Sequence, residues 1–271
     1  MKTSNAITDM KIFVPLFLIS IFTSSCVTLY KPDAIISPQL SERHQFRGSA
    51  SIGLLGCGVG NFSGAYSVTK RIAITGGFMF HAKNSEYSAP KSLGLGRHNQ
   101  FYAQAGAGYF KTYDRMKRFF VQYYGGAGLG YSDNYFSQPD ASHIKMQCSY
   151  HTMYVQPGVY YTNKYYDAAF DLRVSYLNLF GITSTSSLYR HKTFYFAMAE
   201  PTFTFRIGSK TFRPFLQTGY TLPLIDRSTY MTLNTAESKT WQSLMKFSLG
   251  FNLSFREDTR NSQKFLNWKN K

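Results

Sequence analysis

A strict alternation of apolar and polar residues between Lys246 and Phe255 constrains the fold of this chain more than any other feature. Phenylalanine and leucine occupy every second position, and lysine, serine, glycine and asparagine occupy the positions between them. Because successive side chains of a β-strand point to opposite faces, the segment predicts a strand with one apolar and one polar face.

The composition fits a chain whose apolar residues alternate with polar ones in this way. Aromatic residues make up 17% of the sequence and charged residues 16%, whereas a soluble domain has about 25% charged residues. The mean hydropathy is nevertheless negative, and after Phe22 no apolar run approaches the roughly 18 residues that a membrane helix needs. Together these features are typical of a membrane β-barrel.

Alternating segments recur along the chain, and no helical period of 3.6 residues is sustained after the first apolar run. The even number of predicted strands, most of them long enough to cross a membrane with a tilt, predicts an all-β protein. We expect a closed antiparallel up-and-down transmembrane β-barrel of about ten strands over residues 46–256. The predicted strands are 46–55, 61–68, 71–81, 100–112, 119–132, 144–161, 165–179, 193–208, 212–223 and 242–256.

The connections between these strands alternate in length. Every second connection is short, and those between them are long, apart from 56–60. Membrane barrels have tight periplasmic turns and longer outer loops, so with ten strands both termini of the barrel are expected on the periplasmic side. The short connections are 69–70, 113–118, 162–164 and 209–211, and the long ones are 82–99, 133–143, 180–192 and 224–241.

The first residues have the pattern of an export signal. Lys11 precedes the apolar run Ile12–Phe22, and Thr23-Ser24-Ser25 leads to Cys26. This resembles a bacterial lipoprotein signal over residues 1–25, which implies lipidation of Cys26. Ordinary signal-peptidase cleavage near Ser25 is the alternative, and Met1 and Met10 are both possible starts. Residues 26–45 are expected to form a polar periplasmic tether, and residues 257–271 a basic periplasmic tail.

Two further cysteines, Cys57 and Cys148, leave two possibilities open. In an exported protein they can form a disulfide, or they can be unpaired, partly buried thiols.

Charged residues within the predicted strands fall on the polar face, as expected if the other face meets lipid, where a basic residue at mid-bilayer costs about 2–4 kcal/mol. The predicted lumen charges can act as a plug, by pairing and making the interior rigid, or can line a narrow pore. In a barrel of this size we favour the plug. They are Asp171, Arg173, Glu200, Arg206, Arg213 and Lys246.

The net charge of +16 does not indicate nucleic-acid binding, because the excess lies on the predicted periplasmic turns and tail. There it can contact anionic phospholipid head groups. Three histidines, His143, His151 and His191, lie near serines, but the chain has neither a Gly-x-Ser-x-Gly nor a His-Glu-x-x-His motif. We therefore expect no catalytic residue, metal or cofactor.

Several segments resemble the small lipidated outer-membrane β-barrel proteins of Gram-negative bacteria. They are Thr23–Cys26, Tyr154–Val159, Ala199–Phe203 and the closing strand. The closing strand is also similar to the signal that hands such proteins to the barrel-insertion machinery. This resemblance implies an assembly role for Ser248, Gly250, Leu253 and Phe255.

We therefore expect a non-enzymatic outer-membrane lipoprotein with a structural or interaction role and exposed outer loops. It can form a narrow pore, and its partners are outer-membrane lipids, the insertion machinery and an unknown surface ligand or periplasmic protein. One alternative is a soluble periplasmic lipoprotein with a lipocalin-like barrel, apolar inside and polar outside. Another is an outer-membrane lipid-modifying enzyme.

Overall fold

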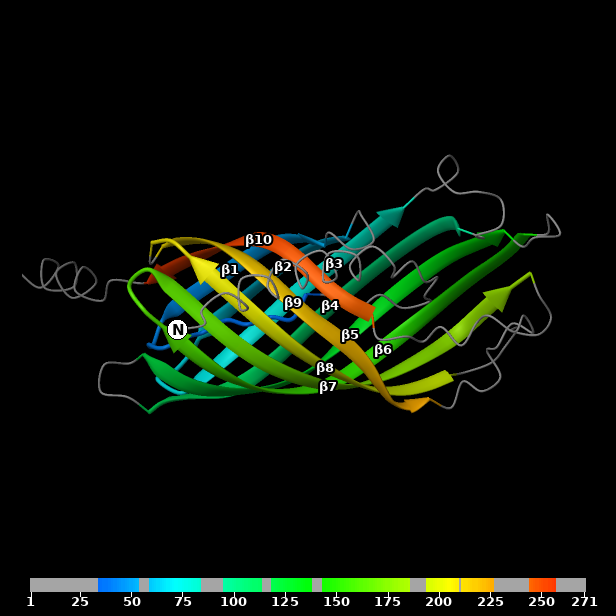
Figure 1. Cartoon of the computed structure of the whole chain (residues 1–271). Coiled ribbons are helices and arrows are strands. Elements are labelled where there is room, and N and C mark those ends of the chain that lie inside the picture. Colours follow the sequence, from blue (N-terminus) through cyan, green and yellow to red (C-terminus); the bar gives the residue numbers. More distant parts are fainter. Residues whose placement is uncertain are drawn as a thin grey trace, which may run out of the picture.

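Ten strands form a closed barrel in the computed structural model, which describes residues 34–53, 59–83, 95–113, 118–137, 143–185, 194–209, 211–226 and 244–256. Long, tilted strands wind around a single axis (Figure 1). The strands are β1 (Gln45–Gly53), β2 (Val59–Ser67), β3 (Ile72–Lys83), β4 (Leu95–Thr112), β5 (Phe119–Ser137), β6 (His143–Thr162), β7 (Tyr166–Ser184), β8 (Phe194–Ile207), β9 (Phe212–Asp226) and β10 (Leu244–Arg256).

Each strand pairs with its neighbours in sequence, and the first pairs with the last. The order around the barrel is β1-β10-β9-β8-β7-β6-β5-β4-β3-β2. The seam between β1 and β10 is antiparallel and runs the whole length of β1, from Gln45 opposite Arg256 to Gly53 opposite Ser248. The predicted ten-stranded up-and-down barrel is confirmed.

The two rims of the barrel differ in the length of their connections. At the rim that we call the turn end, short connections join β2 to β3, β4 to β5, β6 to β7, and β8 to β9. Two of them are closed by main-chain hydrogen bonds, from Thr69 to Ile72 at 3.1 Å and from Asn163 to Tyr166 at 2.7 Å. β1 begins and β10 ends at this rim, and the opposite rim is the loop end. The predicted alternation holds for the connections from β3 to β4, β7 to β8 and β9 to β10, whereas residues 54–58 and 138–142 at the loop end are as short as the turns, the second because β5 extends beyond its predicted end.

Several strands extend farther toward the loop end than the sequence predicts. β4 begins at Leu95 instead of Gln100, β5 ends at Ser137 instead of Ser132, and β7 ends at Ser184 instead of Leu179. The residues added mix apolar and polar side chains without a strict alternation, so the sequence pattern gives no strand there. Main-chain pairing with a neighbouring strand does not require apolar side chains, which is why these strands continue beyond the predicted bounds.

The wall of the barrel is apolar outside and largely polar inside. In β7, Asp167, Asp171 and Arg173 point inward and are buried, while Tyr166 and Phe170 point outward and are exposed. Large apolar side chains are exposed in this way on all ten strands. The predicted facing of the strands is correct. Near the loop end the inward positions of β7 carry the apolar residues Leu177, Leu179 and Ile182.

Glycines of β5 make room for tyrosines that lie inside the barrel. Tyr150 of β6 is opposite Gly130 and is fully buried, and a Cβ atom added to Gly130 would overlap the ring of Tyr150. Gly126 is in the same position relative to Tyr154, whose hydroxyl would lie 2.6 Å from an added Cβ. These glycines thus leave space for large rings inside a narrow barrel.

We therefore expect Gly130→Ala to destabilise the folded barrel by about 1–3 kcal/mol, because the buried Tyr150 ring must move within a packed interior. Gly125→Ala is the matched control on β5, since an added Cβ there meets only the carbonyl oxygen of Tyr154 at 3.6 Å. Thermal unfolding in detergent, followed by the β-sheet circular dichroism signal, measures both. Equal melting temperatures for the two variants would contradict this account of the glycines.

Candidate functional site

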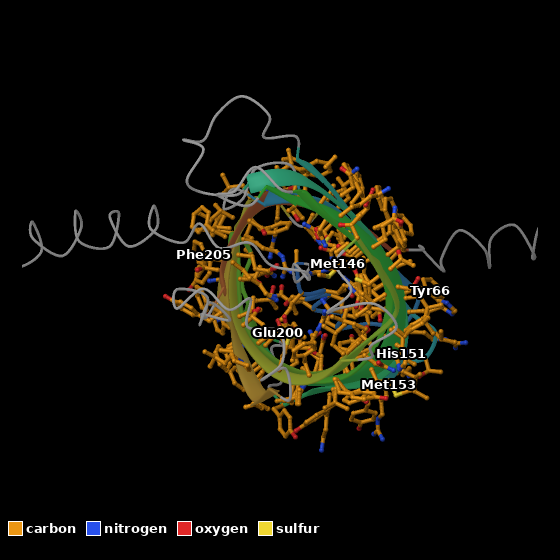
Figure 2. The ribbon with its side chains drawn as sticks, turned by 90° about the vertical axis from the view of Figure 1, so that its right-hand side faces the viewer. Tyr66, Met146, His151, Met153, Glu200 and Phe205 are labelled. Atoms are coloured by element: carbon orange, nitrogen blue, oxygen red, sulfur yellow. The ribbon has the colours of Figure 1, made fainter. Side chains whose placement is uncertain are left out.

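The lumen is the candidate site, because the charged and polar side chains of the wall converge there. In the end-on view of Figure 2, Glu200 and Met146 lie within the ring of strands, whereas Met153 and Phe205 lie on its outer side. All six charged residues predicted to face the lumen are buried. Two more, Arg47 and Asp167, are buried with them.

One group is centred on Glu200 of β8, midway along the barrel. Its carboxylate forms a 2.5 Å ion pair with the ammonium group of Lys246 on β10. The hydroxyls of Ser175 and Thr221 each donate a hydrogen bond of 3.3 Å to the same carboxylate. Because β8 and β10 are separated by β9 in the barrel, this ion pair braces strands that do not pair directly.

A second group surrounds Asp167 near the turn end. Asp167 forms an ion pair with Arg213 of β9, and its second oxygen lies 3.6 Å from the guanidinium group of Arg47 on β1. Arg213 also donates to the main-chain carbonyls of Asn163 and Ser209, each at 2.9 Å. These contacts connect β1, β7 and β9 with the adjacent turns.

Asp171 and Arg173 of β7 form a third group with Gln156 of β6. The amide of Gln156 donates to Asp171 at 3.0 Å, and its oxygen accepts from Arg173 at 3.2 Å. The hydroxyl of Tyr160 also donates to Asp171, and the guanidinium group of Arg173 lies 4.5 Å from the centre of the Tyr154 ring. Asp171 and Arg173 thus both have neutral polar partners, as burial requires.

Residues 34–41, which we call the plug segment, lie inside the lumen. The prediction of a periplasmic tether over residues 26–45 is therefore wrong for the part of it that the structure describes. Ile35, Ile36 and Leu40 are buried, and the blue ribbon of this region lies within the ring of strands in Figure 2. The segment contains no charged residue, which is the sequence signal that could have indicated a buried position.

Side chains of the wall hold the plug segment chiefly by its main chain. Gln217 of β9 both accepts from the amide and donates to the carbonyl of Ile35, each at 3.0 Å. Gln156 donates to the carbonyl of Ile36 at 2.7 Å, and Gln122 of β5 donates to the carbonyl of Leu40 at 3.0 Å. These bonds replace the sheet pairing that an extended segment lacks, so its buried main chain is not left unsatisfied.

Arg206, the one predicted lumen charge not yet described, is bound to the plug segment. Its Nη2 atom donates to the carbonyl of Ser37, and its guanidinium group lies 5.9 Å from the centre of the Phe215 ring. The Nε and Nη1 atoms of this buried side chain have no hydrogen-bond partner among the described residues. Arg47 donates to the side-chain oxygen of Gln39 at 3.3 Å, so two arginines face the segment.

The segment ends in a tight turn that leads into β1. Leu40 packs with Ala65, Ala73, Phe110 and Tyr124 inside the turn end. Two residues there, Gln39 with a φ of 49° and His44 with a φ of 56°, adopt the left-handed conformation that side chains disfavour. The amide of His44 donates to the carbonyl of Ser67 at 3.0 Å and fixes the reversal.

An apolar cluster occupies the loop end of the lumen. It contains three methionines, Met79, Met146 and Met198, and the inward-facing Leu177 and Leu179, all buried. The stacked rings of Tyr102 and Tyr150, with centres 5.8 Å apart, belong to it. The lumen residues predicted from the sequence are all charged, so this apolar cluster was not predicted. The loop-end half of the lumen therefore contains the larger apolar cluster, with polar side chains such as Gln100 and Asn134 buried beside it, and the buried charges lie from the middle of the lumen to the turn end.

The remaining predicted residues are the cysteines, the assembly signal and the histidines. Cys148 is a buried, free thiol. Cys57 lies outside the described residues, as does Cys26, so the pairing of Cys57 with Cys148 stays a prediction. The four residues of the predicted assembly signal lie on β10, with Ser248 inward and Phe255 outward. His151 faces outward and contacts Phe180, with ring centres 5.8 Å apart.

Two features are absent from the described residues. They contain no group of three or more His, Cys, Asp or Glu side chains that could hold a metal ion. None of their segments is a helix long and apolar enough to cross a membrane.

Comparisons with known proteins give a likeness of fold. No family model matches the sequence, and no curated protein matches it. Among solved structures, the chain is similar to one described as "CymD monoaromatic hydrocarbon channel", with 10% identity and a TM-score of 0.29. The match covers 81% of this chain and 90% of that one. A similarity at this level carries no information on what the present protein binds or transports.

The ion pair between Glu200 and Lys246 gives a test of the lumen. Glu200→Ala removes the carboxylate that faces a buried ammonium group, so we expect the barrel to lose about 3–5 kcal/mol of unfolding free energy. The double variant Glu200→Ala/Lys246→Met removes both charges and should regain most of this loss. Urea unfolding in detergent micelles measures the difference. A double variant no more stable than Glu200→Ala would show that the ion pair is not the cause.

Proposed function

We propose that this protein is a non-enzymatic, lipid-anchored barrel of the outer membrane, closed at rest, whose long loops interact with partners outside the cell. The observation that carries the proposal is the facing of its wall. Every strand exposes large apolar side chains outward, while the buried charges point into the lumen. This arrangement suits a barrel with lipid around it.

The energetics of the wall favour a membrane over water. A soluble monomer rarely exposes a contiguous apolar patch of more than a few hundred Å², whereas here the exposed apolar side chains surround the whole barrel. Examples from its different sides are Phe62, Leu129, Val155 and Phe203, each more than 40% exposed. A lipocalin-like barrel would have the reverse facing, with polar side chains outside and apolar side chains inside.

The turn end has the side chains expected where a barrel meets lipid head groups. Tyr109, Phe119, Tyr165 and Tyr166 are exposed at this rim, and aromatic side chains of this kind are enriched at membrane interfaces. Basic residues lie beside them, and they suit the anionic head groups of an inner leaflet. The exposed basic residues are Lys70, Arg71, Lys111, Arg118 and Lys164. Both features support a periplasmic turn end.

The plugged state follows from the contents of the lumen. Ion pairs, glutamine side chains and the plug segment fill its turn-end half. The loop end remains as the side from which an external partner can be bound.

A pair of valine variants tests the membrane location. Val155 is 58% exposed on the outer face of β6, and Val68 is 41% exposed at the turn end. In lipid, Val155→Arg should cost about 2–4 kcal/mol at mid-bilayer, while Val68→Arg should be tolerated near the head groups. The yield of the heat-modifiable, folded form in liposomes is the measurement. If both variants and the parent fold equally well in buffer without detergent, the membrane location is wrong.

Lipidation of Cys26 is tested separately. Cells that produce the protein are expected to incorporate labelled palmitate into it, and Cys26→Ser should abolish the label without preventing barrel formation, because the wall does not depend on the anchor. Cys148→Ser is the matched control, since this buried thiol of β6 should leave the label unchanged. Equal labelling of Cys26→Ser and the parent protein would exclude the anchor.

A further inference from the structure

We propose that residues 34–41 are a displaceable plug and that the chamber they occupy is part of an anion-selective path through the barrel. The inference rests on the proposed membrane-spanning function and goes beyond it, because it assigns the closed state to one segment and a charge preference to the open state. It is based on the hydrogen bonds that hold the plug segment, on the arginines that face it and on the buried charges inside the wall.

The plug segment is bound as a removable occupant and is not built into the wall. None of its residues belongs to a strand, and four of its main-chain groups are held by the side chains of Gln217, Gln156 and Gln122. When the segment leaves, these amides can bond to water instead. The strand pairing of the wall is complete without the segment, so the barrel does not depend on it for closure.

The bound conformation of the segment also carries strain. Gln39 is left-handed, although it is not a glycine. Such residues persist only where the surroundings impose them. Because this strain is relieved when the segment leaves, it lowers the cost of displacement.

The chamber around the segment has an excess of positive charge. The buried charges of the described wall comprise five cations and three carboxylates. The plug segment adds no charge of its own, so it closes the path without neutralising it. A narrow path lined by excess cations favours anions. The cations are Arg47, Arg173, Arg206, Arg213 and Lys246, and the carboxylates are Asp167, Asp171 and Glu200.

Arg206 has the clearest capacity to receive an anion. In the closed state its Nη2 atom donates to a neutral carbonyl, that of Ser37, and its Nε and Nη1 atoms have no hydrogen-bond partner among the described residues. A guanidinium group forms stronger, charge-assisted bonds with an anion than with a carbonyl. Arg47, which also faces the segment through Gln39, provides a second cation on the same path.

Toward the loop end, the described part of the chain brings side chains but no further main chain into the lumen. Met79, Met146 and Met198 contribute three of these side chains. Methionine is unbranched and flexible, so this layer can rearrange when the plug segment has left. Within the described residues, the plug segment is therefore the part of the main chain that blocks the lumen.

Conductance in planar bilayers tests the plug with substitutions in the full chain. Gln122→Ala/Gln217→Ala removes three hydrogen bonds to the segment and leaves the buried charges in place. We expect its open probability to exceed that of the parent by about tenfold or more, because bonds made only in the closed state are lost. The control is Gln100→Ala, a lumen glutamine that donates to Tyr150 at 2.7 Å, which should stay closed.

The charge preference is tested in a second variant that lacks residues 34–41. In a gradient of potassium chloride, its reversal potential should show chloride preferred over potassium, and adding Arg47→Gln and Arg206→Gln should reduce that preference. Heat-modifiable migration of each variant is checked first, so that failure of the membrane-spanning function appears as failure to insert. Inserted variants that stay as closed as the parent, or that prefer potassium, would overturn the proposal.

Discussion

The pairing of β1 with β10 is the interaction on which the rest of this structure depends. A sheet surrounded by lipid cannot leave an edge of unpaired main-chain groups, because no water is present to satisfy them. The seam removes that edge along the whole of β1. Closure also creates an inside, and only then can the polar face of each strand be buried without lipid contact. The plug segment, the ion pairs and the apolar cluster all occupy the space that this seam encloses.

Burial of charge is the second constraint, and it explains why the lumen is filled as it is. Eight charged side chains are buried within the described wall, and each needs partners, since an isolated charge away from water is costly. Direct ion pairs satisfy Glu200 with Lys246 and Asp167 with Arg213. Glutamines and tyrosines satisfy Asp171 and Arg173. Arg206 depends on the plug segment, so the electrostatics of the wall and the closed state are linked at that residue.

The two halves of the lumen follow from the same geometry. Near the turn end, polar side chains meet a segment whose main chain needs hydrogen bonds. Near the loop end, inward positions of β3, β6, β7 and β8 carry methionine, leucine and isoleucine. Glycines opposite the buried tyrosines allow large rings to lie in a barrel of ten strands, which has little interior space beyond that needed for side chains. A narrow, filled lumen is the result, and any path through it requires something to move.

The sequence by itself determined the wall of this protein. Alternation with a period of two residues is local, so the strand number, the outward phenylalanines and the inward facing of Asp171, Glu200 and Lys246 could all be predicted from it. Tertiary structure alone decided which lumen residues meet. The partners Ile35 and Gln217 are 182 positions apart, and Glu200 meets Lys246 across an intervening strand. Such contacts are set by the tilt and register of the closed barrel, which no local pattern encodes. For the same reason, a short uncharged segment that had the composition of a tether lies inside the lumen as a plug.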